Sequence, residues 1–109
     1  MASNHDIINE LRKSYAMELE TVENYLANSI DLDGVRAEEI KKALLSDIEE
    51  ELGHARKLGN RIKVLEGRVP GSLDLERAQP FLQPPNDSTD VVAVIRGVIR
   101  AEDEAIDQY

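Results

Sequence analysis

The chain has 109 residues, enough for one domain with a modest core, and only 4% of them are aromatic, so that core must be aliphatic. It contains no Cys, which excludes disulfides, thiolate metal sites and thiol nucleophiles. The net charge of -9 argues against nucleic-acid binding and suits a protein that handles cations. The N-terminus lacks a secretion signal, and no run reaches the roughly 18 apolar residues of a membrane span. We therefore expect a soluble, cytoplasmic protein with no nucleic-acid or membrane partner.

The first predicted element is one amphipathic helix over about residues 4–31. Ser3, with Asp6 three residues later, resembles a capping box at its start. Beyond this cap, apolar side chains recur at steps of three or four, which is the period of a helix with one buried face. The predicted inner stripe consists of Ile8, Leu11, Tyr15, Leu19, Val22, Leu26 and Ile30.

A second long helix is predicted over about residues 36–66, after a break at residues 31–34 that ends in Gly34. Its inner stripe also has helical period. The stripe consists of Ile40, Leu44, Ile48, Glu51, Ala55, Leu58, Ile62 and Leu65. Because the link between the two helices is short, they should lie side by side and antiparallel.

Residues 67–87 are predicted to form a crossover, because four prolines forbid a continuous helix there, and Ser72 is a candidate cap for a short turn. Asp87 or Ser88 then caps a third helix over about residues 88–109. Its predicted inner face carries Val91, Ile95, Val98, Ile99, Glu102, Ile106 and Tyr109. No helix-ending signal follows Glu102. The expected fold is all-α, a single helical-bundle domain over residues 1–109.

A repeat relates the first and third helices. The segment from Glu18 to Tyr25 reads ELETVENY, and the segment from Glu102 to Tyr109 reads EDEAIDQY. Between them lies a Glu-x-x-His motif, Glu51 and His54. Helical bundles hold a pair of iron or manganese ions with a Glu from each of two helices and a Glu-x-x-His from each of two others. The chain carries three of these four parts, and the fourth is expected beyond Tyr109.

The position of three carboxylates identifies them as candidate metal ligands. Most acidic residues on helices face water, and we assign Glu20, Glu23, Glu49, Glu50 and Glu104 to that group. In contrast, Glu18, Glu51 and Glu102 each fall inside an apolar stripe. Because a buried, unpaired carboxylate costs several kcal/mol, three of them need a shared compensation, and a metal cation provides it. His54 lies one turn beyond Glu51 and adds a nitrogen suited to a transition metal, so the set favours Fe or Mn.

Three further residues are predicted to support the ligands. Tyr25 and Tyr109 each lie two turns after the Glu of the repeat, on the same face. A tyrosine in this position is usually a core aromatic, but its recurrence favours donation of a hydrogen bond to a ligand carboxylate. Asp47 lies one turn before Glu51 and is a candidate partner for the His54 ring, although it suits a solvated position equally well.

These motifs resemble those of the ferritin-like di-iron carboxylate proteins, and within them the bacterioferritin and rubrerythrin branch. The resemblance implies a duplicated four-helix bundle with one long crossover. It also implies that Glu18, Glu51 and His54 bind one metal, that Glu51 bridges, and that Glu102 serves the second metal. Bacterioferritins that bind haem carry a Met directly after the second-helix Glu. Leu52 occupies that place, so we expect no haem.

The fourth helix of this family has no counterpart within the chain, and three explanations are open. The chain is a fragment of a longer protein, or two chains complete the site between them, as encapsulated ferritins do, or the chain carries an incomplete, weak site. In all three cases the apolar stripes would be left uncovered on one side. A homodimer or larger homo-oligomer is therefore expected.

The resemblance implies a ferroxidase that oxidises Fe²⁺ with dioxygen or peroxide for iron storage or detoxification. One alternative is a rubrerythrin-like peroxidase or another di-iron oxidase, which is disfavoured because rubrerythrins usually add a Cys-rich iron domain. The other alternative is a non-catalytic helical assembly module with an incomplete metal site. In that case Glu18→Ala would leave metal uptake unchanged.

Overall fold

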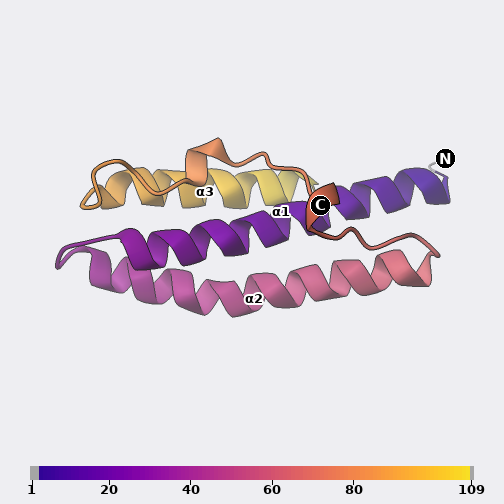
Figure 1. Cartoon of the computed structure of the whole chain (residues 1–109), viewed down its shortest axis with the longest axis horizontal. Coiled ribbons are helices and arrows are strands. Elements are labelled where there is room, and N and C mark those ends of the chain that lie inside the picture. Colours follow the sequence, from indigo (N-terminus) through magenta and orange to yellow (C-terminus); the bar gives the residue numbers. More distant parts are fainter. Residues whose placement is uncertain (1–2, 109) are drawn as a thin grey trace.

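The computed structural model describes residues 3–108, and these form an elongated, all-helical bundle of 49 × 23 × 21 Å. Three α-helices carry the fold: α1 (Asn4–Asp31), α2 (Ala37–Val64) and α3 (Val91–Gln108). The segment between α2 and α3 contains two short 3-10 turns, η1 (Ser72–Asp74) and η2 (Pro80–Leu82). Figure 1 shows α1 between α2 and α3, with the crossover running back along the bundle. The predicted all-α fold is confirmed.

The ends of α1 explain how it starts and how the chain turns into α2. The predicted capping box is confirmed, since the Asp6 amide donates to Ser3 Oγ and the Ser3 amide donates to the Asp6 carboxylate. At the other end, Gly34 has φ of 102°, a conformation that residues with a Cβ rarely adopt. This glycine lets the chain reverse within five residues, so α2 lies antiparallel to α1.

The face of α2 that was predicted to be buried is turned toward α1. Leu44, Glu51, Ala55 and Ile62 are buried, and the other predicted members of the stripe are half-buried. The helix packs mainly on α1, and its first half also contributes Ala37 and Leu44 to the cluster that contains Val94 and Ala101 of α3. The apolar period of α2 was therefore sufficient to identify its inner side.

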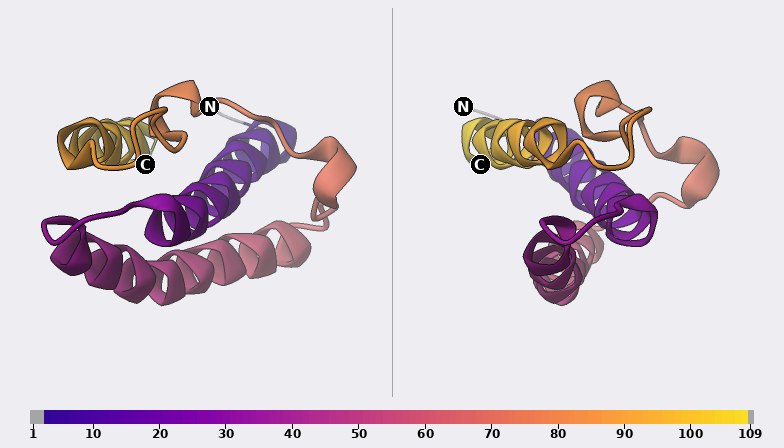
Figure 2. Two further views of the ribbon diagram at one scale, coloured as in Figure 1. Left: turned by 60° about the vertical axis from the view of Figure 1, so that its left-hand side comes forward. Right: turned by 90° about the vertical axis from the view of Figure 1, so that its left-hand side faces the viewer.

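The prediction for α1 was partly wrong. Leu26 and Ile30, placed on the inner stripe, are 47% and 72% exposed. Polar side chains of α1 are buried in their place: Ser14, Glu20, Thr21, Asn24, Asn28 and Ser29. The physical reason is the crossover, which lies along a side of α1 that neither α2 nor α3 covers (Figure 2). An irregular segment has backbone groups to satisfy, and polar side chains satisfy them.

The contact between α1 and the crossover is a network that we call the polar seam, formed by Glu20, Thr21, Asn24, Asn28, Gln79 and the backbone of Ala78 and Leu82. The Ala78 and Gln79 amides donate to the two oxygens of Glu20 at 2.8 and 3.0 Å. The assignment of Glu20 to water was therefore wrong, because two backbone amides compensate its burial. Asn28, which is 1% exposed, donates to the Leu82 carbonyl at 2.8 Å.

The start of α3 differs from the prediction. The helix begins at Val91 and its first turn is capped by Asp90, whose carboxylate accepts from the Ala93 amide at 3.0 Å. Asp87 instead accepts from the amide and hydroxyl of Thr89, and these bonds lower the pKa of the Asp87 carboxyl. Ser88 donates to Asp33 in the α1–α2 link. Both predicted caps are thus engaged in the turn that precedes the helix.

The buried face of α3 also differs from the one predicted. Val94, Gly97 and Ala101 are buried, whereas Ile95 and Ile106 are 38% and 71% exposed. This helix packs on α1 and η2 from one side, and apolar side chains on its other side are uncovered. Nowhere in residues 3–108 is a helix both long enough and apolar enough to cross a membrane.

Candidate metal centre

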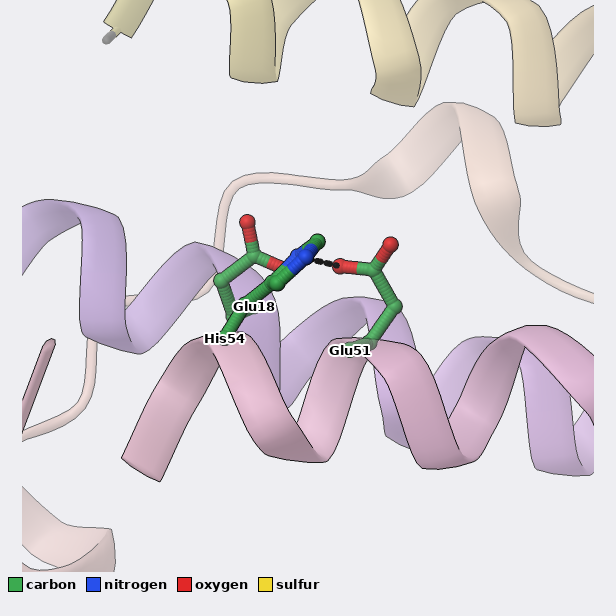
Figure 3. A group of neighbouring side chains, drawn as sticks. All are labelled: Glu18, Glu51 and His54. Atoms are coloured by element: carbon green, nitrogen blue, oxygen red, sulfur yellow. Dashed lines mark ion pairs between the residues drawn. The ribbon is translucent and has the colours of Figure 1, made fainter. Parts of the chain in front are cut away.

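The centre of the α1–α2 pair brings together three of the predicted ligands. Glu18 comes from α1, while Glu51 and His54 come from successive turns of α2 and point toward it (Figure 3). His54 Nδ1 lies 3.7 Å from Glu18 Oε2 and 3.7 Å from Glu51 Oε2. One ligand atom of each residue lies within 4.8 Å of the others. The antiparallel register of two helices is what makes residues 33 apart in sequence neighbours in space.

This donor set fits a divalent transition-metal ion. Metal bonds to carboxylate oxygen and imidazole nitrogen are about 2.0–2.2 Å long, so two ligands of one ion can lie up to about 4.4 Å apart. Glu18 is 3% exposed and Glu51 is 9% exposed, so both carboxylates carry the cost of burial that a cation offsets. The His54 side chain is 41% exposed and connects the trio with solvent.

The trio opens into a small cleft of about 110 Å³ that α3 closes from the opposite side. Glu102 lies at this cleft, but it is exposed and does not belong to the close group of ligand atoms. Glu102 therefore faces the trio, as predicted, but the expectation that it is buried was wrong. Glu102 is exposed because α3 packs on α1 and η2 from one side, which also leaves Ile95 and Ile106 exposed. Besides the four predicted ligands, the cleft is lined by Thr21, Ala101, Ala105 and Ile106.

Tyr25 connects α1 with Glu102. Its side chain is fully buried, and its hydroxyl donates to Glu102 Oε1 at 3.0 Å. Burial raises the pKa of the phenol strongly above its ordinary value, and the neighbouring Glu102 carboxylate raises it further. The structure thus contains the predicted hydrogen bond from Tyr25 to a carboxylate of the repeat, and the role of Glu102 as a ligand stays a prediction.

Because the pKa of Tyr25 is raised in the folded protein, the free energy of unfolding of the metal-free protein changes with pH in the alkaline range. In the unfolded chain Tyr25 ionises near its ordinary value of 10.0, whereas the folded protein keeps the proton. The stabilisation is therefore complete below pH 10 and is lost above it, by up to about 1.4 kcal/mol per pH unit. We expect the free energy of unfolding, measured with urea from pH 8 to 11, to fall less steeply in Tyr25→Phe. Equal slopes would contradict the burial of this hydroxyl.

The other predicted supporting residues have different outcomes. Asp47 forms no hydrogen bond or ion pair with His54 in the part of the chain that is described. Glu50 takes that place, with its Oε1 3.9 Å from His54 Nε2, because it lies one turn before the histidine on the same helix face. Burial raises the pKa of Asp47, and the charge of Glu50 raises it further by a smaller amount. Tyr109 lies outside the described residues.

Sequence reasoning missed two of the cleft-lining residues of α3, Ala101 and Ala105, and the proximity of Glu50 to His54. Ala101 and Ala105 carry no chemical signal that marks them as cleft residues, since alanine is common in any helix. Glu50 is exposed, as expected, and its contact with His54 follows from the spacing of four residues, which places two side chains on one helix face. That spacing is visible in the sequence, so this signal was available.

One of the comparisons with known proteins agrees with the all-helical fold. The family model for the ferritin-like domain matches residues 8–109. The chain therefore belongs to the ferritin-like domain family. Searches of the curated proteins and of the solved structures found no match.

Proposed function

We propose that the protein binds Fe²⁺ at Glu18, Glu51 and His54 and oxidises it to Fe³⁺. The observation that carries the proposal is the convergence of two buried carboxylates and an imidazole at one cleft between two helices. Membership of the ferritin-like family and the net charge of -9 support it. Carboxylates are hard ligands that suit iron in both oxidation states. Mn²⁺ is the other cation that such a site suits.

In this proposal each residue has a separate task. Glu18, Glu51 and His54 would hold one Fe²⁺, and Glu51 and Glu102 would serve a second Fe²⁺ at the same cleft. Tyr25 orients the Glu102 carboxylate through its hydroxyl. Each Fe²⁺ gives one electron to dioxygen or peroxide, which enters through the exposed side at His54. The released Fe³⁺ passes to storage or detoxification.

We also propose that the protein works as a homodimer or larger homo-oligomer. A second copy would cover apolar side chains that α1 and η2 leave exposed on α3. Exposed isoleucines beside Glu102 on α3, Ile95, Ile99 and Ile106, give such a partner an apolar surface to cover. Native mass spectrometry at several protein concentrations measures the assembly, and a monomer throughout would contradict it.

Substitution of His54 is the test of the metal site. Loss of a residue that only hydrogen-bonds to a metal ligand weakens metal binding about 10- to 100-fold. We expect His54→Ala, which removes a ligand itself, to weaken Fe²⁺ binding by more than this. Calorimetry without oxygen measures the binding. The rate of Fe³⁺ formation after addition of dioxygen or peroxide should fall with it. Comparing the two oxidants separates a ferroxidase from a peroxidase.

The chain contains one other histidine, which provides a matched control. His5 lies exposed near the start of α1, and its Nε2 contacts Asn9. His5→Ala should leave binding and oxidation unchanged. If the parent neither bound nor oxidised Fe²⁺, the protein would be a helical assembly module. If both variants bound and oxidised Fe²⁺ like the parent, the metal site would not be formed by Glu18, Glu51 and His54. The same conclusion would follow if Glu18→Ala left metal uptake intact.

A further inference from the structure

The placement of α3 depends on the crossover as well as on α1. At Gly97 the helix lies so close to η2 that a Cβ would be 2.6 Å from the Phe81 carbonyl oxygen and 3.2 Å from the Leu82 side chain. Leu82 is 1% exposed and belongs to the same buried cluster as Val94 and Ala101 of α3. Because backbone cannot yield as a flexible side chain can, this contact fixes how closely α3 approaches η2.

The crossover is held in turn by α1 through the polar seam. Gln79 is 3% exposed, and its side chain accepts from Asn24 at 3.0 Å and donates to Thr21 at 2.7 Å. Its amide donates to Glu20, and the Leu82 carbonyl accepts from Asn28. These bonds lie in low-exposure surroundings, where hydrogen bonds hold their geometry well. The crossover is thus attached to the helix that carries Glu18.

We propose that the polar seam and the Gly97 contact position Glu102 relative to Glu18, Glu51 and His54. In this view Gln79, Asn28, Glu20 and Gly97 are positioning residues for the metal centre, although none of them lines its cleft. The link runs from α1 through the crossover and η2 to α3, and it ends at Glu102. This inference rests on the proposed function in so far as Glu102 binds a metal.

The hydrogen bond between Tyr25 and Glu102 reports the same placement without any metal. Its donor is on α1 and its acceptor on α3, at a distance of 3.0 Å. A Cβ at position 97 would push α3 away from η2, and even a small shift of α3 would lengthen or break the hydrogen bond between Tyr25 and Glu102. The chain has no Trp and three Tyr, so a background with Tyr15→Phe and Tyr109→Phe leaves Tyr25 as the dominant near-ultraviolet chromophore. Loss of a hydrogen bond to a carboxylate changes the absorption of a phenol.

The first experiment compares two alanine substitutions of helical glycines. Gly97→Ala places a Cβ against Phe81, whereas Gly53→Ala on α2 meets no atom within 4 Å. Both changes raise helix propensity, so a loss in Gly97→Ala cannot come from a weaker helix. We expect Gly97→Ala to shift the Tyr25 absorption and to weaken binding of the Fe²⁺ that Glu102 serves about 10- to 100-fold. Binding at Glu18, Glu51 and His54 should stay unchanged.

A second variant tests the seam, with a control for general loss of stability. Gln79→Ala removes the bonds to Asn24 and Thr21 and should produce the same absorption shift and the same selective loss of one Fe²⁺. Ile62→Val weakens a fully buried core position on α2 and should produce neither. Circular dichroism at the temperature of the experiment shows that each variant is folded.

The outcomes separate this inference from the proposed function. An unshifted Tyr25 absorption in both Gly97→Ala and Gln79→Ala overturns the positioning role, even if the parent binds Fe²⁺ as proposed. A shift in Ile62→Val equal to theirs overturns it as well, because the effect would then follow stability alone. If the parent binds no Fe²⁺, the proposed function fails, and the absorption still decides whether the seam places Glu102.

Discussion

We expect Leu82→Ala to lower the free energy of unfolding by about 2–5 kcal/mol, the range for truncating a buried leucine to alanine. The side chain is 1% exposed and packs in the cluster that joins η2 with α1, α2 and α3. Its loss would leave a cavity at the point where the crossover supports α3. Urea unfolding followed by circular dichroism measures the change. Protein concentration must be held constant, since an oligomer is stabilised by mass action.

Leu73 provides the matched control for this prediction. It lies in the same crossover, in η1, but it is 98% exposed. Leu73→Ala should therefore change the free energy of unfolding by no more than about 0.5 kcal/mol. Equal losses in the two variants would mean that η2 does not anchor the core, and the account of how α3 is supported would be wrong.

The second large effect is expected at Glu20. Glu20→Ala removes the acceptor for the Ala78 and Gln79 amides. Gln79 is buried, and a buried amide left without a partner costs about 1–3 kcal/mol. The expected result is a lower free energy of unfolding together with faster proteolysis within residues 75–83, because the crossover is no longer held to α1. Limited proteolysis followed by mass spectrometry locates the cuts.

Glu23 is the natural comparison, since it lies one turn later on α1 and also contacts the crossover. Its partner is Arg77, at 2.7 Å, and both side chains are about half exposed. Exposed ion pairs contribute little to stability. Glu23→Ala should therefore have a much smaller effect than Glu20→Ala. If the two variants were equally stable, the seam would not hold the crossover.

Much of this fold was accessible from the sequence because two long helices with a short link leave little choice of partner. The period of α2 identified its inner face, and the antiparallel register then brought Glu51 and His54 to Glu18. The Tyr25 hydroxyl was expected to meet a carboxylate, and it does. In each case a helix packs on a helix, and periodicity carries the information.

The errors concern contacts that periodicity does not encode. Glu20 was assigned to water because it is an acidic helix residue outside the apolar stripe, but the amides of an irregular segment bind it. The exposure of Glu102 depends on which elements cover α3, and the apolar period of α3 alone does not predict this. Asp87, Ser88 and Asp90 are all suitable helix caps. The choice among them falls to Asp90 because the other two are engaged with Thr89 and Asp33.

The polar seam also has a consequence for the order in which the chain folds. Its bonds join residues up to 59 positions apart, as between Glu20 and Gln79. Closing so long a loop costs more chain entropy than closing the short link between α1 and α2. We therefore expect the helical hairpin to form first and the crossover with α3 to dock later. Glu18, Glu51 and His54 would then already be together before Glu102 arrives.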